Sequence, residues 1–369
     1  MTNDKVEKKY SKRASKWKLI LLLLILALVS VIIVCLNIGF TVPGTQPITF
    51  QEVLGILGKQ IPGVNTYVDT SAIIPSHEAV IMLVRLPRIL GAALVGAGLA
   101  AAGVMYQGIF RNPMADSYLL GASAGASLSY TAAALYAGSL LSVTIVGIGF
   151  SQIFAFLGAI ITVFVVYLIS RTGKKVPVTT LLLSGLVANV FLLAIQSVFL
   201  IQAHEADAVG GILSFMFGNL SHINWQDVYV VFPLVFIGIL LSYFYTKDLN
   251  MLSMGDDTAQ HLGVNTERVR KILLALSSLI TGAVVSISGV IGFVGLVIPH
   301  MTRLVIGPDH RILLPTAAII GGIYLILCDT IARIATGQAA ELQVGVVTAI
   351  IGTPIFIYLL RRKKTTYAL

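Results

Sequence analysis

The sequence predicts an all-α polytopic membrane protein of about ten transmembrane helices, with both termini in the cytoplasm. Of its 369 residues, 57% are hydrophobic and 11% are charged, and the mean hydropathy is +0.92. Apolar stretches of about 20 residues recur along the chain, and each is long enough to cross a hydrocarbon core roughly 30 Å thick as a helix. These spans use nearly the whole length, which leaves no room for a soluble catalytic domain.

The expected organisation has three parts: a basic tail at 1–18, a ten-helix membrane domain at 19–360 and a basic tail at 361–369. The first apolar run covers 19–40 and follows seven Lys and Arg residues. It is too long for the apolar region of a signal peptide, which has about 7 to 15 residues. We therefore expect this run to be the first membrane helix, held by a basic cytoplasmic tail.

Hydropathy places nine spans, at 19–40, 83–107, 117–137, 143–170, 178–202, 226–246, 271–289, 312–334 and 343–360. Both ends of the chain are basic, and the excess of Lys and Arg on the cytoplasmic side of membrane proteins places both ends there. An even number of crossings is then required. The tenth is expected in 290–307, an apolar stretch that Gly292, Gly295 and Pro299 interrupt.

The basic residues support this topology, because all but four of the 25 Lys and Arg fall on the cytoplasmic side. The four outside are Lys59, Arg85, Arg88 and Arg333. The net charge of +9 therefore reflects membrane orientation, and no nucleic-acid partner is expected. Cys35 and Cys328 both lie in apolar runs without a disulfide or metal-binding spacing, so we predict no metal site.

Two motifs imitate enzyme signatures and are expected to be packing features instead. Residues 121–125 read G-x-S-x-G, the nucleophile elbow of serine hydrolases, which requires a preceding strand and a later histidine and acid. Residues 96–101 read G-x-G-x-x-A, similar to a dinucleotide-binding fingerprint, but in the middle of a span. Small residues at four-residue spacing let membrane helices approach closely, so no catalytic residue is predicted.

The loop between the sixth and seventh spans is expected to hold a short helix lying across the cytoplasmic face. Asp256 or Asp257 is suited to cap its start, and Gly263 is suited to end it. Asn265 is then the expected cap of the seventh span, with Glu267 in its first turn. The whole segment consists of Gly255, Asp256, Asp257, Thr258, Ala259, Gln260, His261, Leu262 and Gly263. On these residues alone, an ordinary helix-capped connector is the alternative interpretation.

Three arginines on the outer side run against the topology signal, because a basic residue there costs insertion energy unless something uses it. Arg85 and Arg88 are expected where the second span begins, and Arg333 where the ninth ends. One interpretation is that they reach toward lipid headgroups. The other is that they pair with carboxylates of a docked protein, since the planar guanidinium suits a carboxylate.

Five segments carry a resemblance to a known family: RLPRILGAALVGAGLAAAGVMYQGIFRNPMADSYLLGASAGASL at 85–128, MGDDTAQHLGV at 254–264, SGVIGFVGLVIPHMTRLVIGPDHRILLP at 288–315, CDTIAR at 328–333 and ELQVGVVTAIIGTPIF at 341–356. Together they resemble the permease family of ABC importers for iron-siderophores, haem and cobalamin. Two positions depart from the usual family pattern. Gln343 stands where proline is more common, and Phe215 stands where tryptophan is usual, which bears on substrate.

The resemblance implies a multi-pass subunit of a bacterial cytoplasmic membrane that works with partner chains. These partners are a second permease subunit, identical or homologous, two cytoplasmic ATPase subunits and an extracytoplasmic substrate-binding protein. The chain contains no G-x-x-x-x-G-K-[ST] phosphate-binding loop, so ATP and Mg are expected on the ATPase subunits, with no cofactor bound directly. The expected cargo is an iron-siderophore type chelate moving inward, with haem or cobalamin as the alternative.

The resemblance also implies roles for the residues singled out above. The segment 255–263 resembles the helices that dock in the ATPase cleft, and Arg85, Arg88 and Arg333 become the expected contacts for the binding protein. A cytoplasmic gate is expected in the turn between the second and third spans, from Gln107 to Met114. Its named residues are Gln107, Arg111, Asn112, Pro113 and Met114.

Two functions from other classes remain as alternatives, a secondary transporter and an intramembrane enzyme. A proton-coupled transporter should show ionisable residues in the middle of its spans. Asp329 is the one acid expected within a span, which argues weakly against proton coupling.

Overall fold

The computed structural model describes residues 20–21, 23–36, 48–60, 73–138, 143–145, 147–173, 176–203, 206–335 and 341–366. The expected N-terminal tail at 1–18 lies outside these residues. Within the described part, six helices are long and apolar enough to cross a membrane: Pro75–Phe110, Phe150–Ser170, Val178–Gln202, Trp225–Phe244, Thr266–Ser288 and His310–Ala335. The helical membrane fold is therefore confirmed, whereas ten crossings stay a prediction. Shorter apolar helices cover Leu23–Leu36, Ala208–Phe217, Val294–Ile306 and Val344–Leu359.

The second span begins eight residues before its predicted start. It is one continuous helix made of α3 (Pro75–Ala79), a π-helical segment η2 (Val80–Arg85) and α4 (Leu86–Phe110). Its polar first turn is supported by α2 (Phe50–Lys59), a helix that hydropathy did not reveal. Lys59 pairs with Glu78 at 2.8 Å, and His77 meets Glu52 at 3.0 Å. Hydropathy detects only the apolar part of a helix. It therefore missed the start of this helix, which polar contacts stabilise.

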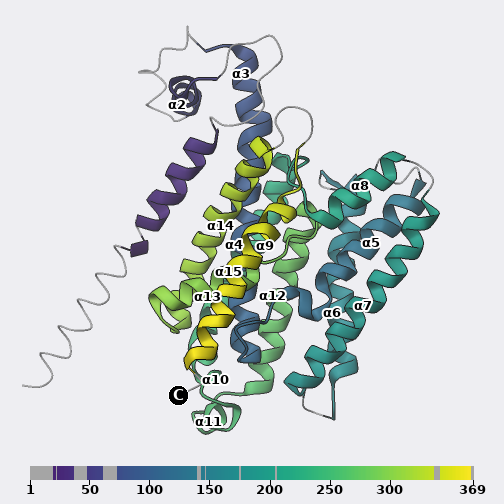
Figure 1. Cartoon of the computed structure of the whole chain (residues 1–369), viewed down its shortest axis with the longest axis vertical. Helices are drawn as coiled ribbons and strands as arrows, with labels where there is room; N and C mark the ends of the chain where they lie inside the picture. The colour runs from purple at the N-terminus through teal and green to yellow at the C-terminus, as the bar shows by residue number, and fades with distance from the viewer. Residues whose placement is uncertain are drawn as a thin grey trace, which may run out of the picture.

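The next helices lie together on one side of the molecule (Figure 1). They are η3 (Ser117–Leu120), α5 (Ala122–Tyr136), α6 (Phe150–Ser170), α7 (Val178–Gln202) and α8 (Ala206–Phe217). A small antiparallel pair, β1 (Thr144–Ile145) with β2 (Ile148–Gly149), precedes α6. The predicted span start at 143 was therefore wrong, because this pair occupies its first residues. The predicted span 178–202 is confirmed to the residue.

The remaining helices form the other side of the bundle. They are α9 (Trp225–Phe244), α10 (Thr246–Leu252), α11 (Asp256–His261), α12 (Thr266–Ser288), α13 (Val294–Ile306), α14 (His310–Ala335) and α15 (Val344–Thr366). Figure 1 shows α10 and α11 at one end of the bundle, with α2 and α3 at the opposite end. We call these the α11 end and the α2 end. α15 continues to Thr366, so most of the expected tail at 361–369 is helical.

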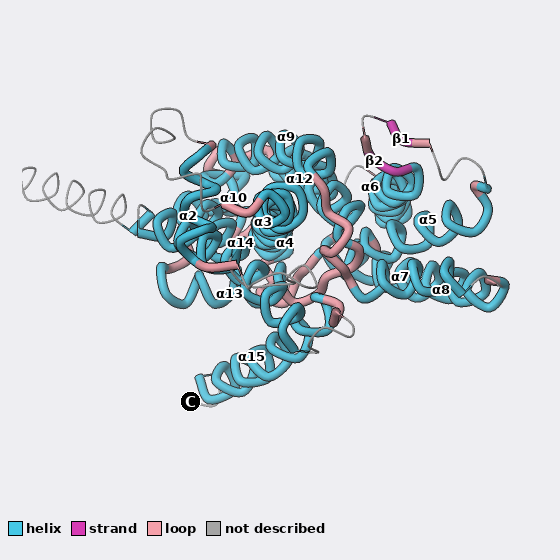
Figure 2. The backbone as a smooth tube through the Cα atoms, turned by 90° about the horizontal axis from the view of Figure 1, so that it is seen from above, coloured by secondary structure: helices cyan, strands magenta, loops and turns pink. Residues whose placement is uncertain are grey.

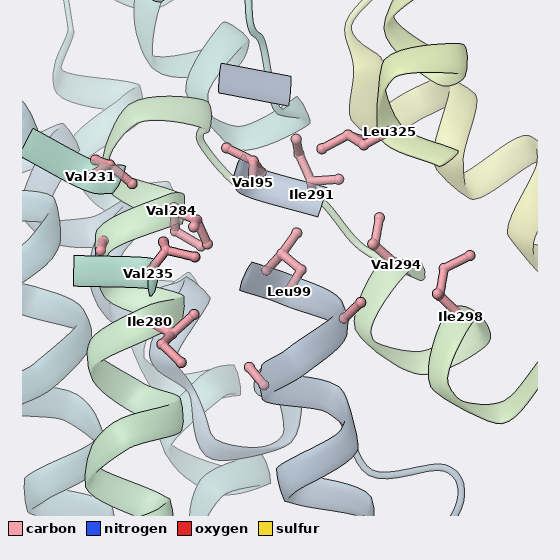
Figure 3. Close-up of a cluster of buried hydrophobic side chains, with 14 of the residues drawn as sticks. Val95, Leu99, Val231, Val235, Ile280, Val284, Ile291, Val294, Ile298 and Leu325 are labelled. Atoms are coloured by element: carbon pink, nitrogen blue, oxygen red, sulfur yellow. The ribbon is translucent and has the colours of Figure 1, made fainter. Parts of the chain in front are cut away.

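The core lies around α4, which Figure 2 shows in the middle of a ring of helices that includes α9, α12, α13 and α14. In Figure 3, Leu99 and Val95 of α4 point toward Val284 of α12 and Val235 of α9. These four side chains are buried. Hydrocarbon lipid gives helices no hydrophobic drive to associate, so close van der Waals contact of this kind holds a membrane bundle together.

Glycine is required where α4 meets its neighbours. A Cβ at Gly96 would collide with the backbone oxygen of Gly321 in α14, and one at Gly103 would collide with the backbone oxygen of Gly295 in α13. A Cβ at Gly125 would likewise strike Thr162 of α6. The two enzyme-like motifs thus lie in helix contacts, and Ser123 is buried in α5. Both were correctly interpreted as packing features.

Candidate functional site

The short helix predicted in 255–263 is present as α11, between α10 and α12. Its N-cap is Gly255, whose φ of 117° is a conformation that favours glycine. The prediction that Asp256 or Asp257 caps the helix was wrong, because both lie in the first helical turn. Gly263 follows the helix with a φ of 87°, and Asn265 caps α12 by accepting a hydrogen bond from the backbone N–H of Arg268 at 3.0 Å. These two predictions are confirmed.

α11 presents a polar face to solvent and a small apolar face to the bundle. Ala259 is fully buried, whereas Leu262 is exposed. Thr258, Gln260 and His261 are also exposed. α11 is thus anchored to the bundle through Ala259, while its other side chains named here are open to solvent.

Asp256 links α11 to two other parts of the chain. Its carboxylate accepts hydrogen bonds from Nη2 of Arg270 at 2.6 and 2.7 Å. The same carboxylate lies 3.5 Å from Nη2 of Arg111, the residue that ends α4. Glu267 lies 3.7 Å from Arg270 on the same helix. The described part of the chain thus brings α4, α11 and α12 together at one aspartate.

The predicted gate residues divide into two groups. Gln107 was expected in a turn, but α4 continues to Phe110, so Gln107 lies inside the helix and is buried. Its amide donates to the backbone oxygen of Leu296 at 3.1 Å and ties α4 to α13. The turn itself is 111–114, where Arg111 adopts a φ of 49°. Asn112 accepts from the backbone N–H of Met114 at 3.0 Å, and Pro113 lies between them. We call 111–114 the gate turn.

The gate turn borders a hollow of about 520 Å³ in the side of the molecule. Its walls come from the segment 114–119, α8, the start of α13 and α15. The lining side chains are mostly apolar: Met114, Asp116, Tyr118, Leu119, Met216, Phe217, Val290, Phe293, Leu296, Val346, Ala349 and Ile350. Asp116 is the one ionisable carboxylate among them, and it accepts from the backbone N–H of Ser117 at 2.7 Å. We call this hollow the side cavity.

One wall of the side cavity has an unusual backbone. Phe293 adopts a φ of 68°, a left-handed conformation that costs a non-glycine residue of order 1–3 kcal/mol. Its ring packs against Gly352 of α15, where a Cβ would approach the ring atoms too closely. Phe215, the departure from the family pattern, stacks on Tyr130 with ring centroids 4.0 Å apart, and its backbone oxygen accepts from the N–H of Val290 at 2.9 Å. Its neighbours Met216 and Phe217 form the lining.

The outer arginines are buried in a charge cluster. Arg333 lies in the last turn of α14, as expected, whereas Arg85 and Arg88 lie inside a helix. Arg88 donates to Asp329 at 2.9 and 3.0 Å and to Glu341 at 2.7 Å. Arg333 lies 3.1 Å from the other carboxylate oxygen of Asp329, and Arg85 donates to the backbone oxygen of Leu36 at 2.7 Å. The expected position of Arg85 and Arg88 at a helix start was wrong, because their helix begins at Pro75.

Sequence reasoning named Asp329 as an isolated acid but did not pair it. Asp329 and Arg333 are four residues apart on α14, a spacing that places them on one helix face. That spacing could have revealed the pair. Glu341, Asp116 and Phe293 gave no comparable local signal, since each acts through a partner from another element.

The chain matches the FecCD transport family over residues 22–362. The cobalamin import system permease protein BtuC of Halobacterium salinarum is 41% identical over 287 residues, which cover 78% of this chain and 74% of that protein. The Fe(3+)-citrate import system permease protein YfmD of Bacillus subtilis is 38% identical over 289 residues, 78% of this chain and 83% of that protein. A solved structure described as an inward-facing, metal-chelate type ABC transporter aligns with a TM-score of 0.75 and 30% identity, over 93% of this chain and 99% of that one.

Proposed function

Because this chain belongs to the FecCD transport family and is a permease subunit of an ABC importer, we propose that it moves an iron-siderophore type chelate inward across a bacterial cytoplasmic membrane. A second permease subunit, two ATPase subunits and an extracytoplasmic binding protein complete the importer. ATP and Mg act on the ATPase subunits. The alternative of a secondary transporter is set aside by the family.

The side cavity supports this cargo and forms one wall of the translocation path. Its lining is apolar, with aromatic and methionine side chains and the single carboxylate of Asp116. Hard metal ions are held by several oxygen or nitrogen ligands, and this wall offers no such set. A metal already wrapped in an organic chelator brings its own ligands, so the wall of the path does not have to supply any.

The relatives support a metal chelate as cargo and leave its chemistry open. The similarity to a permease named for iron(III)-citrate import supports iron. The 41% identity to a permease named for cobalamin import makes cobalamin the second candidate, and haem is the third. The three cargoes differ in size and charge, so direct transport measurements separate them.

The cargo is tested in proteoliposomes that contain the permease, its ATPase subunits and its binding protein. Iron(III)-citrate, an iron(III)-hydroxamate siderophore, haemin and cyanocobalamin are supplied separately. We expect ATP-dependent accumulation of an iron chelate, with no accumulation when the ATPase is inactivated. Accumulation of cyanocobalamin or haemin alone would contradict the proposed cargo, but it would still agree with an importer function.

The ATPase contact is proposed to be α11, through its exposed face. Leu262→Glu places a charge on that face, where the side chain is exposed and contributes little to the fold. We expect the purified variant to lose copurifying ATPase. The matched control is Leu54→Glu on α2, an exposed leucine at the opposite end of the molecule. Equal recovery of ATPase by both variants would exclude α11 as the docking helix.

Docking of the binding protein is proposed at Glu341 and the arginines beneath it. Glu341 is exposed, whereas Arg88 is buried, so a carboxylate of the binding protein must replace Glu341 to reach Arg88. Glu341→Gln removes the carboxylate that competes for Arg88, so the binding protein should associate faster at low salt. Charges at the rim of an interface mainly set the association rate. Lys59→Gln on the same end is the control. Unchanged and salt-insensitive association would count against docking at this cluster.

A further inference from the structure

The contacts of Asp256 point to a device that joins the ATPase-facing helix to the gate turn. We propose that Asp256 is a positioning residue, fixed to α12 through Arg270 and joined reversibly to the gate turn through Arg111. This inference rests on the proposed function, since it takes α11 as the ATPase contact. It adds the residue through which movement of α11 reaches the translocation path.

The contact with Arg270 is the firm side of the device. Both oxygens of Asp256 accept from Nη2 of Arg270, at 2.6 and 2.7 Å, and the Arg270 side chain is only 7% exposed. Hydrogen bonds between ionised groups at these distances are about twice as strong as neutral ones. Glu267 adds a second carboxylate at 3.7 Å. The start of α11 is therefore held to the start of α12.

The contact with Arg111 is the loose side. Its closest approach is 3.5 Å, and the Arg111 and Asp256 side chains are 41% and 33% exposed. An exposed ion pair of this kind contributes about 0–1 kcal/mol, so a small displacement of α11 suffices to break it. The Arg111 guanidinium also borders the start of α11, since its Nη1 would lie 3.8 Å from a Cβ at Gly255, an ordinary van der Waals distance.

Arg111 passes a displacement on to the path because it opens the gate turn. It is the residue after α4 and has a left-handed φ of 49°, so its backbone is already strained. Asn112 braces the turn through bonds to the N–H groups of Met114 and Ala115, at 3.0 and 3.1 Å. Met114 and Asp116 then line the side cavity. A continuous series of contacts thus runs from α11 to the cavity wall.

The same arrangement distinguishes this device from simple bracing of the fold. To stabilise the fold, the buried contact of Asp256 with Arg270 is sufficient. To transmit movement, Asp256 also needs a second contact that breaks easily, as the contact with Arg111 does. Removing Arg111 should leave the fold and the ATPase contact intact and affect only the response of the gate turn. Arg311 provides a matched comparison, since it is also an exposed arginine that pairs with an aspartate, Asp309, at 2.8 Å, and its segment contacts Asn250 of α10.

The test uses Met114→Cys as a reporter in the complete complex with its ATPase subunits, reconstituted in nanodiscs. The native cysteines, Cys35 and Cys328, are buried, so a polar maleimide reports mainly on position 114. In the reporter protein, labelling rates should differ between the nucleotide-free and the ATP–vanadate states. Adding Arg111→Gln should make the two rates equal while ATP hydrolysis continues. Adding Arg311→Gln should preserve the difference.

Asp256→Asn should reproduce the effect of Arg111→Gln, and the double variant should be no more severe than either single one, as expected for residues acting through one contact. If Arg111→Gln keeps the difference in labelling rate of the parental reporter protein, the proposed role of Asp256 is refuted, whereas the proposed importer function is unaffected. The same holds if Arg311→Gln abolishes the difference as well. If no ATPase associates with the reporter protein, both the proposed function and this inference fail.

Discussion

The two ends of the molecule each hold an aspartate between two arginines, and they differ in burial. At the α2 end, Asp329 lies between Arg88 and Arg333, and its side chain is 0% exposed. At the α11 end, Asp256 lies between Arg270 and Arg111 and is 33% exposed. The same combination of one aspartate and two arginines is therefore closed to water at one end and partly open to it at the other.

Burial decides what such a cluster can do. Removing charges from water is costly, so a buried set is stable only when every charge keeps a partner, and breaking it leaves an uncompensated charge. At an exposed site, water replaces a lost partner and the contact is easily exchanged. We infer that the α2 cluster fixes α4 to α14, whereas the α11 cluster is suited to movement.

The largest effect is expected for Asp329→Asn. This change removes the carboxylate from between two buried arginines, and loss of one partner of a buried ion pair costs about 3–5 kcal/mol. Thermal unfolding of the purified protein in mild detergent should show a large drop in midpoint and poor recovery of monodisperse protein. A midpoint close to the parental value would refute the structural role of the α2 cluster.

Asp256→Asn is expected to destabilise the protein less, by about 1–3 kcal/mol. Arg270 keeps Glu267 at 3.7 Å, and Arg111 is free to turn toward water from its exposed position. The same thermal measurement applied to both variants tests the contrast between the ends directly. A cost for Asp256→Asn equal to that of Asp329→Asn would remove the contrast.

Replacing arginine by lysine sharpens the comparison without removing charge. Arg88 reaches Asp329 through Nε and Nη2 and Glu341 through Nη1, a set that one ammonium group does not reproduce. Arg88→Lys should therefore lose about 1–3 kcal/mol of stability, whereas Arg111→Lys should lose less than about 1 kcal/mol. Similar unfolding midpoints for the two lysine variants would contradict the difference in burial.

Much of the fold was predictable because its signals are local. Apolar length defined the helix Val178–Gln202, and residue types with known capping roles placed α11 and the start of α12. Gly255 was named within the coupling segment but not as the cap. Its role depends on a backbone conformation, with a φ of 117°, that residue type alone does not specify.

The charge clusters were not predictable in the same way, because their partners come from distant parts of the chain. Arg88 meets residues 241 and 253 positions later. The excess of basic residues on one side of a membrane predicts on which side a charged residue lies. It does not predict whether a carboxylate on another helix pairs with that residue. The outer arginines were therefore recognised as exceptions, but their internal partners were missed.

The smallest effect is expected at a third contact, Asp309 with Arg311, which lies at the α11 end beside water. Hydrogen bonds from the Arg311 side chain, with a further one from Asn250, lower the pKa of Asp309 to about 2, from about 3.9 in an unfolded chain. Because the folded pKa is the lower one, this contact contributes fully above pH of about 4 and is lost as the pH falls through about 2.

Asp309→Asn should thus lower the unfolding midpoint slightly at neutral pH, by the equivalent of less than about 1 kcal/mol, because both side chains border on water. Its deficit should shrink as the pH is lowered from about 4 toward about 2, since protonation makes the parental side chain neutral like the variant's. Midpoints of both proteins measured across this range test the sign. A deficit that stayed constant as the pH falls to about 2 would show that the charge of Asp309 is unimportant. Asp309 would then act through the hydrogen bond that it accepts from the side-chain amide of Asn250 at 2.8 Å. The contribution of the exposed contacts at the α11 end to stability would then depend on hydrogen-bond geometry and not on charge.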